Sequence, residues 1–121
     1  MTKTKPPVYK ERHEQRMFVK WFYLQYHSQK LAAFVNGFKR TPLQSQLLIY
    51  DGMLPGIPDI VILAPRGQYG ALFIEMKRSK GGIVSEAQEA VIAHLNANGY
   101  KACVCEGFDA ARKVTTEYMS Q

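Results

Sequence analysis

Two apolar runs that flank a turn-rich segment constrain the fold of this chain most strongly. The runs are DIVILA and ALFIEMK, and the segment PRGQYG between them contains a proline and two glycines. This pattern predicts a β-hairpin. If the hairpin folds symmetrically about Gly67, Val61 faces Phe73 and Leu63 faces Ala71 across the two strands.

The same register gathers charged residues at the far end of the hairpin. Asp59 then faces Glu75, and Lys77 projects from the same face because side chains in a strand alternate with a period of two. A slip of one residue would turn Asp59 to the opposite face. Burying such groups without partners costs on the order of several kcal/mol, so the arrangement requires compensation.

Two interpretations of this charged patch remain open. Neighbouring carboxylates repel each other and resist joint ionisation unless a cation lies between them. A divalent metal suits such a pair, and Mg²⁺ is commonly held by one or two carboxylates completed by water and substrate phosphate. The alternative is a salt-bridge cluster at the end of the sheet.

The formal net charge of +6 is concentrated in the first third of the chain. Residues 1–40 contain nine of the 16 Lys and Arg residues but two of the ten Asp and Glu residues. A basic segment of this kind is typical of proteins that bind a polyanion, most commonly nucleic acid. No apolar run approaches the roughly 20 residues that span a bilayer, and the start lacks the apolar core of a signal peptide. These features predict a cytoplasmic protein.

The chain of 121 residues is expected to form one domain, with a core over about 9–119 after a polar leader, 1–8. The predicted fold is an α/β layer arrangement in which a mixed sheet with a central hairpin is flanked by helices. Outside the hairpin, the predicted segments are a helix within 9–29, a short buried strand at 31–37, a helix at 41–53, a helix at 85–99, a strand at 100–106 and a helix at 109–119 capped by Asp109.

In the first predicted helix, a glutamate heads the apolar face. Met17, Phe18, Trp21 and Leu24 recur at helical spacing, and Glu14 precedes the first three by three, four and seven positions. Glutamate is rarely buried, so Glu14 is a candidate site residue. The alternative is an ordinary first-turn acid, which the helix dipole favours.

These motifs resemble the PD-(D/E)XK nuclease superfamily and, within it, the VRR-NUC (virus-type replication-repair nuclease) family in its stand-alone phage and bacterial form. The chain shows a G-x-P-D motif at 56–59, an E-x-K motif at 75–77 and a serine-x-x-glutamine helix start at 85–88. The family also carries a glutamate on its N-terminal helix, which Glu14 matches. The resemblance spans about 14–105 and implies a restriction-endonuclease-like core.

The resemblance implies a metal-dependent phosphodiesterase. Asp59 and Glu75 would bind Mg²⁺ or Mn²⁺, and the backbone carbonyl of Met76 would add a third oxygen. Lys77 would orient the attacking water or stabilise the charge that develops on the phosphoryl group. Glu14 would complete the site through a metal-bound water or a second metal.

Two roles for Gln88 remain open. In similar nucleases the equivalent side chain reaches the site, whereas Ser85 followed by Gln88 three residues later is also a capping box. One side chain is not expected to make both sets of hydrogen bonds well. On the same helix, His94 lies on the predicted apolar face and is predicted to pack in the core instead of binding a metal.

Similarity to stand-alone members of the family implies a homodimer that cuts branched DNA in the manner of a Holliday-junction resolvase. The aromatic richness of the first helix agrees with a dimer interface. The alternatives are a monomeric flap or nicking nuclease and a DNA-binding module that does not cleave. No base-reading module accompanies the motifs, which favours backbone contacts. The candidate phosphate contacts, each otherwise a solvated charge, are Lys39, Arg40, Arg78 and Lys80.

Overall fold

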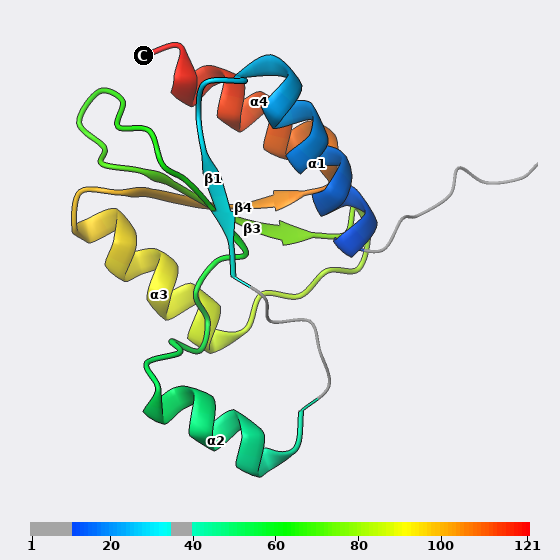
Figure 1. Ribbon diagram of the computed structural model, residues 1–121, viewed down its shortest axis with the longest axis vertical. Coiled ribbons are helices and arrows are strands. Elements are labelled where there is room, and N and C mark those ends of the chain that lie inside the picture. Colours follow the sequence, from blue (N-terminus) through cyan, green and yellow to red (C-terminus); the bar gives the residue numbers. More distant parts are fainter. Residues whose placement is uncertain (1–10, 35–39) are drawn as a thin grey trace, which may run out of the picture.

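The computed structural model describes residues 11–34 and 40–121, so the predicted polar leader lies outside the described residues (Figure 1). The elements follow the predicted order. None of the described helices is long and apolar enough to cross a membrane. The elements are α1 (Glu11–Gln25), β1 (Leu31–Ala33), α2 (Pro42–Tyr50), β2 (Ile60–Ile62), β3 (Leu72–Lys77), α3 (Glu86–Ala97), β4 (Lys101–Glu106) and α4 (Phe108–Met119).

The strands form one mixed sheet in the order β1-β2-β3-β4. β2 and β3 make the predicted antiparallel hairpin, and β4 joins β3 in parallel after α3. Val61 pairs with Phe73, which confirms the symmetric register. At the tip, Arg66 and Tyr69 exchange backbone hydrogen bonds of 3.0 and 2.9 Å, and Gly67 supplies the positive φ of the turn. The pairing extends to Ile60 and Ile74, next to the charged residues at the far end of the hairpin.

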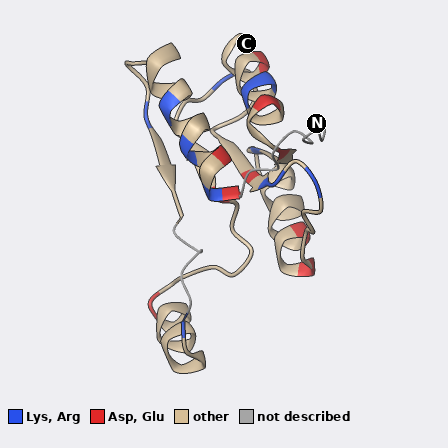
Figure 2. Cartoon of the chain, turned by 90° about the vertical axis from the view of Figure 1, so that its right-hand side faces the viewer, with Lys and Arg blue, Asp and Glu red and all other residues tan. Residues whose placement is uncertain are grey.

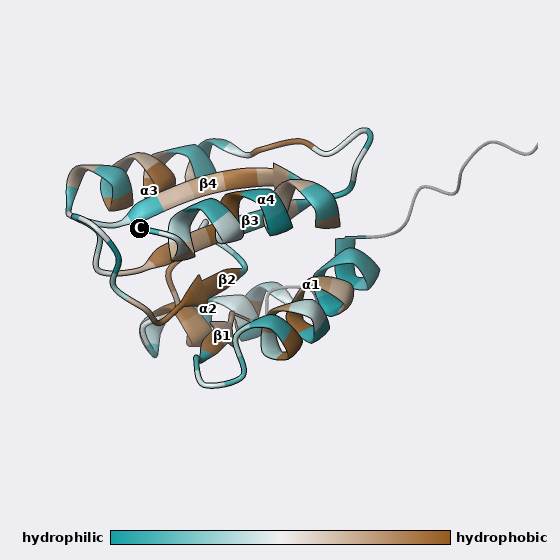
Figure 3. Ribbon diagram, turned by 90° about the horizontal axis from the view of Figure 1, so that it is seen from above, coloured by the Kyte–Doolittle hydropathy of each residue, from teal (hydrophilic) through white to brown (hydrophobic). Residues whose placement is uncertain are grey.

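The core lies between one face of the sheet and the helices α1 and α4. Figure 3 shows the apolar strands in brown among these helices. The fully buried Tyr118 closes one end of the core, where its hydroxyl donates to the carbonyl oxygen of Ala64 at 2.7 Å. Each large side chain buried here stabilises the fold by roughly 1.5–3 kcal/mol. The largest apolar members of the cluster are Phe18, Phe22, Ile60, Ile62, Leu72, Ile74, Met76 and Tyr118.

The buried face of α1 differs in part from the predicted one. Phe18 is fully buried as predicted, but the next core residue is Phe22, and Leu24 is 75% exposed. Residues four apart share a helix face, whereas Leu24 follows Phe18 by six positions and points away. The buried stripe therefore has Glu14, Phe18 and Phe22 at intervals of four.

Three further predictions are corrected by the packing. β1 is a three-residue edge strand, largely exposed instead of buried, and 35–37 lies outside the described residues. His94 is exposed and its ring lies 3.4 Å from the Asn98 amide, because α3 turns Leu95 inward instead. α4 begins after Gly107, which makes no side-chain cap, so Asp109 lies within the first turn.

Candidate active site

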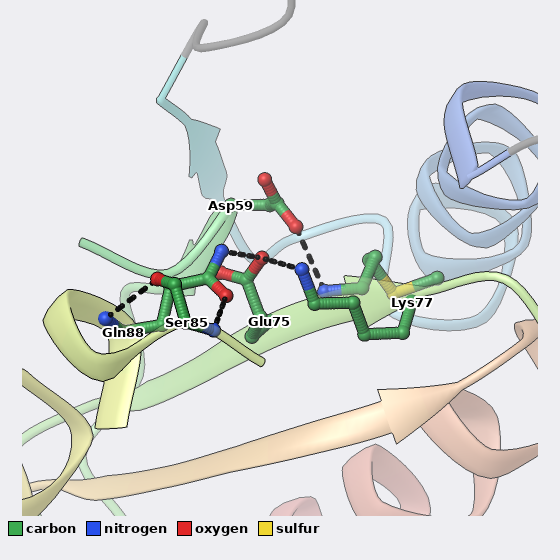
Figure 4. A network of polar contacts seen from close by, with 6 residues as sticks. Asp59, Glu75, Lys77, Ser85 and Gln88 are labelled. Atoms are coloured by element: carbon green, nitrogen blue, oxygen red, sulfur yellow. Dashed lines mark hydrogen bonds and ion pairs between the residues drawn. The ribbon is translucent and has the colours of Figure 1, made fainter. Parts of the chain in front are cut away.

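Asp59 lies at the end of the hairpin, directly before β2, and its position is fixed from two sides. Its Oδ2 accepts a hydrogen bond from the Met76 backbone N–H at 2.8 Å (Figure 4). Its carbonyl oxygen accepts from the N–H of Phe34 at 2.8 Å. The preceding Pro58 is fully buried. The Asp59 carboxylate therefore accepts the hydrogen bond from β3 that a backbone carbonyl would accept if the strand pairing continued.

Glu75 is the centre of the cluster and is only 2% exposed. Its Oε1 accepts a hydrogen bond from the Gln88 side-chain amide at 2.8 Å and lies 3.5 Å from the ammonium of Lys77. Figure 4 shows both groups converging on this carboxylate from α3 and β3. The second oxygen, Oε2, is buried and has no hydrogen-bond partner within the described ranges. One oxygen of Glu75 is thus held in place while the other is left unsatisfied.

Burial disfavours the ionisation of both carboxylates, and Asp59 further disfavours that of Glu75. Burial raises the pKa of Glu75 to about 7, the negative charge of Asp59 adds to the rise, and Lys77 opposes it. Burial also raises the pKa of Asp59, against the hydrogen bond from Met76. Near neutral pH, the Glu75 carboxylate is therefore partly protonated unless a cation compensates its charge.

Lys77 is held beside Glu75 by the backbone that follows β3. Its side chain is 10% exposed although it carries a charge. A Cβ added to Gly82 would lie 2.8 Å from the Cβ of Lys77, closer than real Cβ atoms approach, and 3.3 Å from its Cγ. The glycine therefore lets the loop cover the aliphatic part of Lys77 and confines the ammonium to the carboxylate side.

Gln88 serves both of the roles that the sequence left open, so the expectation that one amide would not serve both was wrong. Its Oε1 accepts from the backbone N–H of Ser85 at 3.0 Å, and its backbone N–H donates to the Ser85 hydroxyl at 3.2 Å. Its Nε2 then remains available to donate to Glu75. An amide offers an acceptor and a donor on different atoms, so capping α3 and holding Glu75 do not compete.

Glu14 is buried as predicted, and among the described residues its carboxylate makes no hydrogen bond or ion pair with Asp59, Glu75 or Lys77. α1 packs on the core face of the sheet, toward which Ile74 and Met76 point, whereas Glu75 points to the opposite face. The Glu14 carboxylate lies beside Gly107, 3.2 Å from the point where a Cβ would be. Its Oε2 is buried and finds no hydrogen-bond partner in the part of the chain that the structure describes.

Glu11, which is not among the predicted site residues, lies close enough to Asp59 for its charge to affect that carboxylate. After burial itself, the negative charge of Glu11 contributes to the raised pKa of Asp59. The signal in the sequence was its spacing, three residues before Glu14 at the exposed start of the same helix.

The predicted phosphate contacts are placed unequally. Arg78 and Lys80 are exposed in the loop that follows β3, and the Arg78 guanidinium donates to the Gly81 carbonyl at 3.2 Å. Arg40 precedes α2, where its guanidinium lies 3.3 Å from the sulfur of Met53. Lys39 lies outside the described residues. Arg78 and Lys80 are therefore the cations that the fold keeps adjacent to Lys77.

The donor set fits a hard divalent cation. Both carboxylates are partly desolvated, and among the described residues one oxygen of Glu75 is buried without a hydrogen-bond partner. Such carboxylates are typical ligands of a divalent ion, which neutralises their charge. Among the described residues no group of three or more His, Cys, Asp and Glu side chains could hold a metal. The backbone of Met76 also faces Asp59, because the N–H and C=O of a strand residue point to the same side.

Comparisons with known proteins identify the family of this chain. A family model for the VRR-NUC domain matches residues 4–109. A solved structure of a VRR_NUC domain protein is similar with a TM-score of 0.75 and 25% identity, over 95% of this chain and 92% of that chain. A search of curated proteins finds no match. The chain therefore belongs to the VRR-NUC domain family, which implies a nuclease of the PD-(D/E)XK type.

Proposed function

We propose that this protein is an Mg²⁺- or Mn²⁺-dependent endonuclease that hydrolyses phosphodiester bonds in branched DNA, with a four-way junction as its preferred substrate. The observation that carries the proposal is the convergence of Asp59, Glu75 and Lys77 at the end of one hairpin, with an unsatisfied buried oxygen on Glu75. A salt-bridge cluster alone gives that oxygen no partner, and a bound cation would offset the cost of its burial.

The residues of the site have separable tasks in this reaction. When bound, the divalent ion lowers the pKa of water and polarises the phosphoryl oxygen. Met76 orients Asp59 through its N–H, and Gln88 fixes one oxygen of Glu75, which leaves the other oxygen available as a ligand. The Met76 carbonyl is the proposed third ligand.

Besides the metal ion, the side chain of Lys77 supplies a positive charge to the site. Its ammonium is confined near Glu75, where it stabilises negative charge on the phosphoryl oxygens or orients the attacking water. Arg78 and Lys80, in the following loop, are proposed to contact phosphates that flank the scissile bond. Glu14, whose carboxylate lies against Gly107 where the Gly107 N–H donates to the Lys77 carbonyl, is proposed to join the site through a metal-bound water or a second metal.

A cleavage assay on defined branched substrates tests this function. We expect symmetric incision of a labelled four-way junction with Mg²⁺ or Mn²⁺ and none with EDTA. Incision of 5′ flaps or nicked duplex alone would replace the junction proposal with that of a monomeric flap or nicking nuclease. Tight binding without incision in either metal would favour a DNA-binding module and would contradict the nuclease proposal.

Cutting both strands of a junction requires paired sites, and α2 provides the surface that we propose for a homodimer. The apolar residues of α1, from which a dimer was predicted, are largely used in the core. α2 lies apart from the sheet (Figure 1) and carries no charged residue (Figure 2). Leu43, Leu47 and Tyr50 recur at helical spacing and are 68%, 51% and 76% exposed. This stripe can pair with a second copy despite the net positive charge of the chain.

A charge placed on the stripe is expected to separate the proposed dimer. Leu47→Glu would bury a carboxylate at the interface and should give a monomer at micromolar concentration in analytical ultracentrifugation, while the wild type sediments as a dimer. Leu24→Glu, on the exposed face of α1, is the control and should remain dimeric. A wild type that sediments as a monomer would contradict this proposal.

A further inference from the structure

The loop that leads into the hairpin lies in direct contact with the first turn of α3. A Cβ built on Gly56 would overlap the carbonyl oxygen of Ala87 and would stand 2.9 Å from the backbone nitrogen of Gln88. Real Cβ atoms do not approach other atoms this closely, and both neighbours belong to the backbone of a capped helix. No side-chain movement can therefore make room for a larger residue at position 56.

On the helix side, this contact leads to the site through one residue. The backbone N–H of Gln88 is tied to the Ser85 hydroxyl, and its side-chain oxygen is tied to the Ser85 N–H. The remaining amide donor holds Oε1 of Glu75 at 2.8 Å. Displacing the first turn of α3 would move this donor with it.

On the loop side, the same contact leads to the other carboxylate. Gly56 lies within a turn that is closed by the N–H of Ile57, which donates to the Leu54 carbonyl at 3.2 Å, and the chain then passes through the buried Pro58 to Asp59. One close backbone contact thus joins the loop that delivers Asp59 to the helix that delivers the partner of Glu75.

We propose that Gly56 is a positioning residue of the nuclease site, because its lack of a side chain sets the distance between the Asp59 loop and α3 and so holds Gln88 on Glu75. The proposal rests on the proposed function for its enzymatic meaning. The contact itself is independent of the reaction and is measurable without DNA.

The chain offers a matched control for the backbone strain of a substitution at this position. Gly56 and Gly99 both have a φ of +87°, a conformation that alanine rarely adopts. A Cβ on Gly99 would meet nothing within 4 Å, whereas a Cβ on Gly56 would meet the backbone of α3. Gly56→Ala and Gly99→Ala therefore share the strain, and only the first displaces the helix.

Two measurements on the metal-free and metal-loaded proteins read out the position of Gln88. In the wild type, the hydrogen bond to Glu75 changes the NMR chemical shift of the Gln88 side-chain amide. Gly56→Ala should lose this change in chemical shift, and Gly99→Ala should keep it. The Mg²⁺ affinity from titration calorimetry should fall by about 10–100-fold in Gly56→Ala, as is typical when a group that orients a ligand is displaced, and should stay within about threefold in Gly99→Ala.

Equal Gln88 shifts and equal Mg²⁺ affinities in the two variants would overturn the proposal. If Gly56→Ala does not fold, the wild type still decides the contact, because the α protons of Gly56 and the amide proton of Gln88 should give a strong NOE. Absence of that NOE would overturn the proposal as well. A wild type that binds Mg²⁺ without cutting DNA would refute the nuclease function and leave the comparison of the two variants valid.

Discussion

Lys77→Met is expected to reduce metal-dependent DNA cleavage by about 100-fold or more. The change removes the ammonium beside Glu75 but keeps an unbranched chain of similar length beneath Gly82, so the loop can remain in place. Loss of one group that stabilises transition-state charge typically lowers kcat by about 10²–10³-fold. Initial rates on the best branched substrate, with saturating Mg²⁺, measure the effect.

Binding separates a loss of chemistry from a loss of DNA affinity. In EDTA, fluorescence anisotropy should give Lys77→Met an affinity for DNA within a few-fold of the wild type, since one buried lysine adds little to the contact with phosphates. Lys113→Met, on the exposed side of α4, removes the same charge far along the chain and should cut normally. A Lys77→Met protein that keeps more than about a tenth of the wild-type rate would contradict the role of Lys77.

The metal-free protein is expected to lose stability as the pH rises from about 5 to about 8. Burial and the neighbouring carboxylate raise the pKa of Glu75 from 4.5 to about 7 in the folded protein. Between these values the folded state binds more protons than the unfolded chain does, so the free energy of unfolding falls as the pH rises. The loss is at most roughly 3 kcal/mol. Thermal unfolding in EDTA across this range measures it.

Glu75→Gln and added Mg²⁺ provide the controls for this pH dependence. The glutamine cannot ionise, so the variant should show a much flatter pH profile and should exceed the stability of the wild type above pH 7. Mg²⁺ should stabilise the wild type more at pH 8 than at pH 5, because protons compete with the ion for Glu75. A wild-type Tm in EDTA that does not fall as the pH rises would contradict the raised pKa of Glu75.

Local patterns in the sequence correctly predicted the elements that depend on near neighbours. The alternation of apolar and polar residues on either side of Gly67 fixes the hairpin register, because a shift of one residue would turn the apolar side chains outward. This register places Asp59 toward Glu75. The capping box of α3 likewise needs four consecutive residues. For Gln88, however, the sequence left two roles open, since its second partner, Glu75, lies 13 residues away.

Helical spacing predicted that Glu14 is buried but not which surface it is buried against. A period of 3.6 residues identifies a face, and the packing of α1 beside α4 then decided that this face lies on the core side of the sheet. Similarly, α2 is rich in apolar residues, and the described part of the chain leaves much of that helix exposed. Composition states how much surface is apolar and does not state what covers it.

The sequence by itself thus determined the order of the elements, the strand register and the identities of Asp59, Glu75 and Lys77, because each depends on side-chain periodicity or on residues close in the chain. Only the tertiary structure decided that Gln88 contacts Glu75, that Glu14 lies beside Gly107, and that Gly56 lies against α3. These contacts depend on how separate elements pack, and a distance of a few ångströms between two backbones leaves no periodic signal in a single sequence.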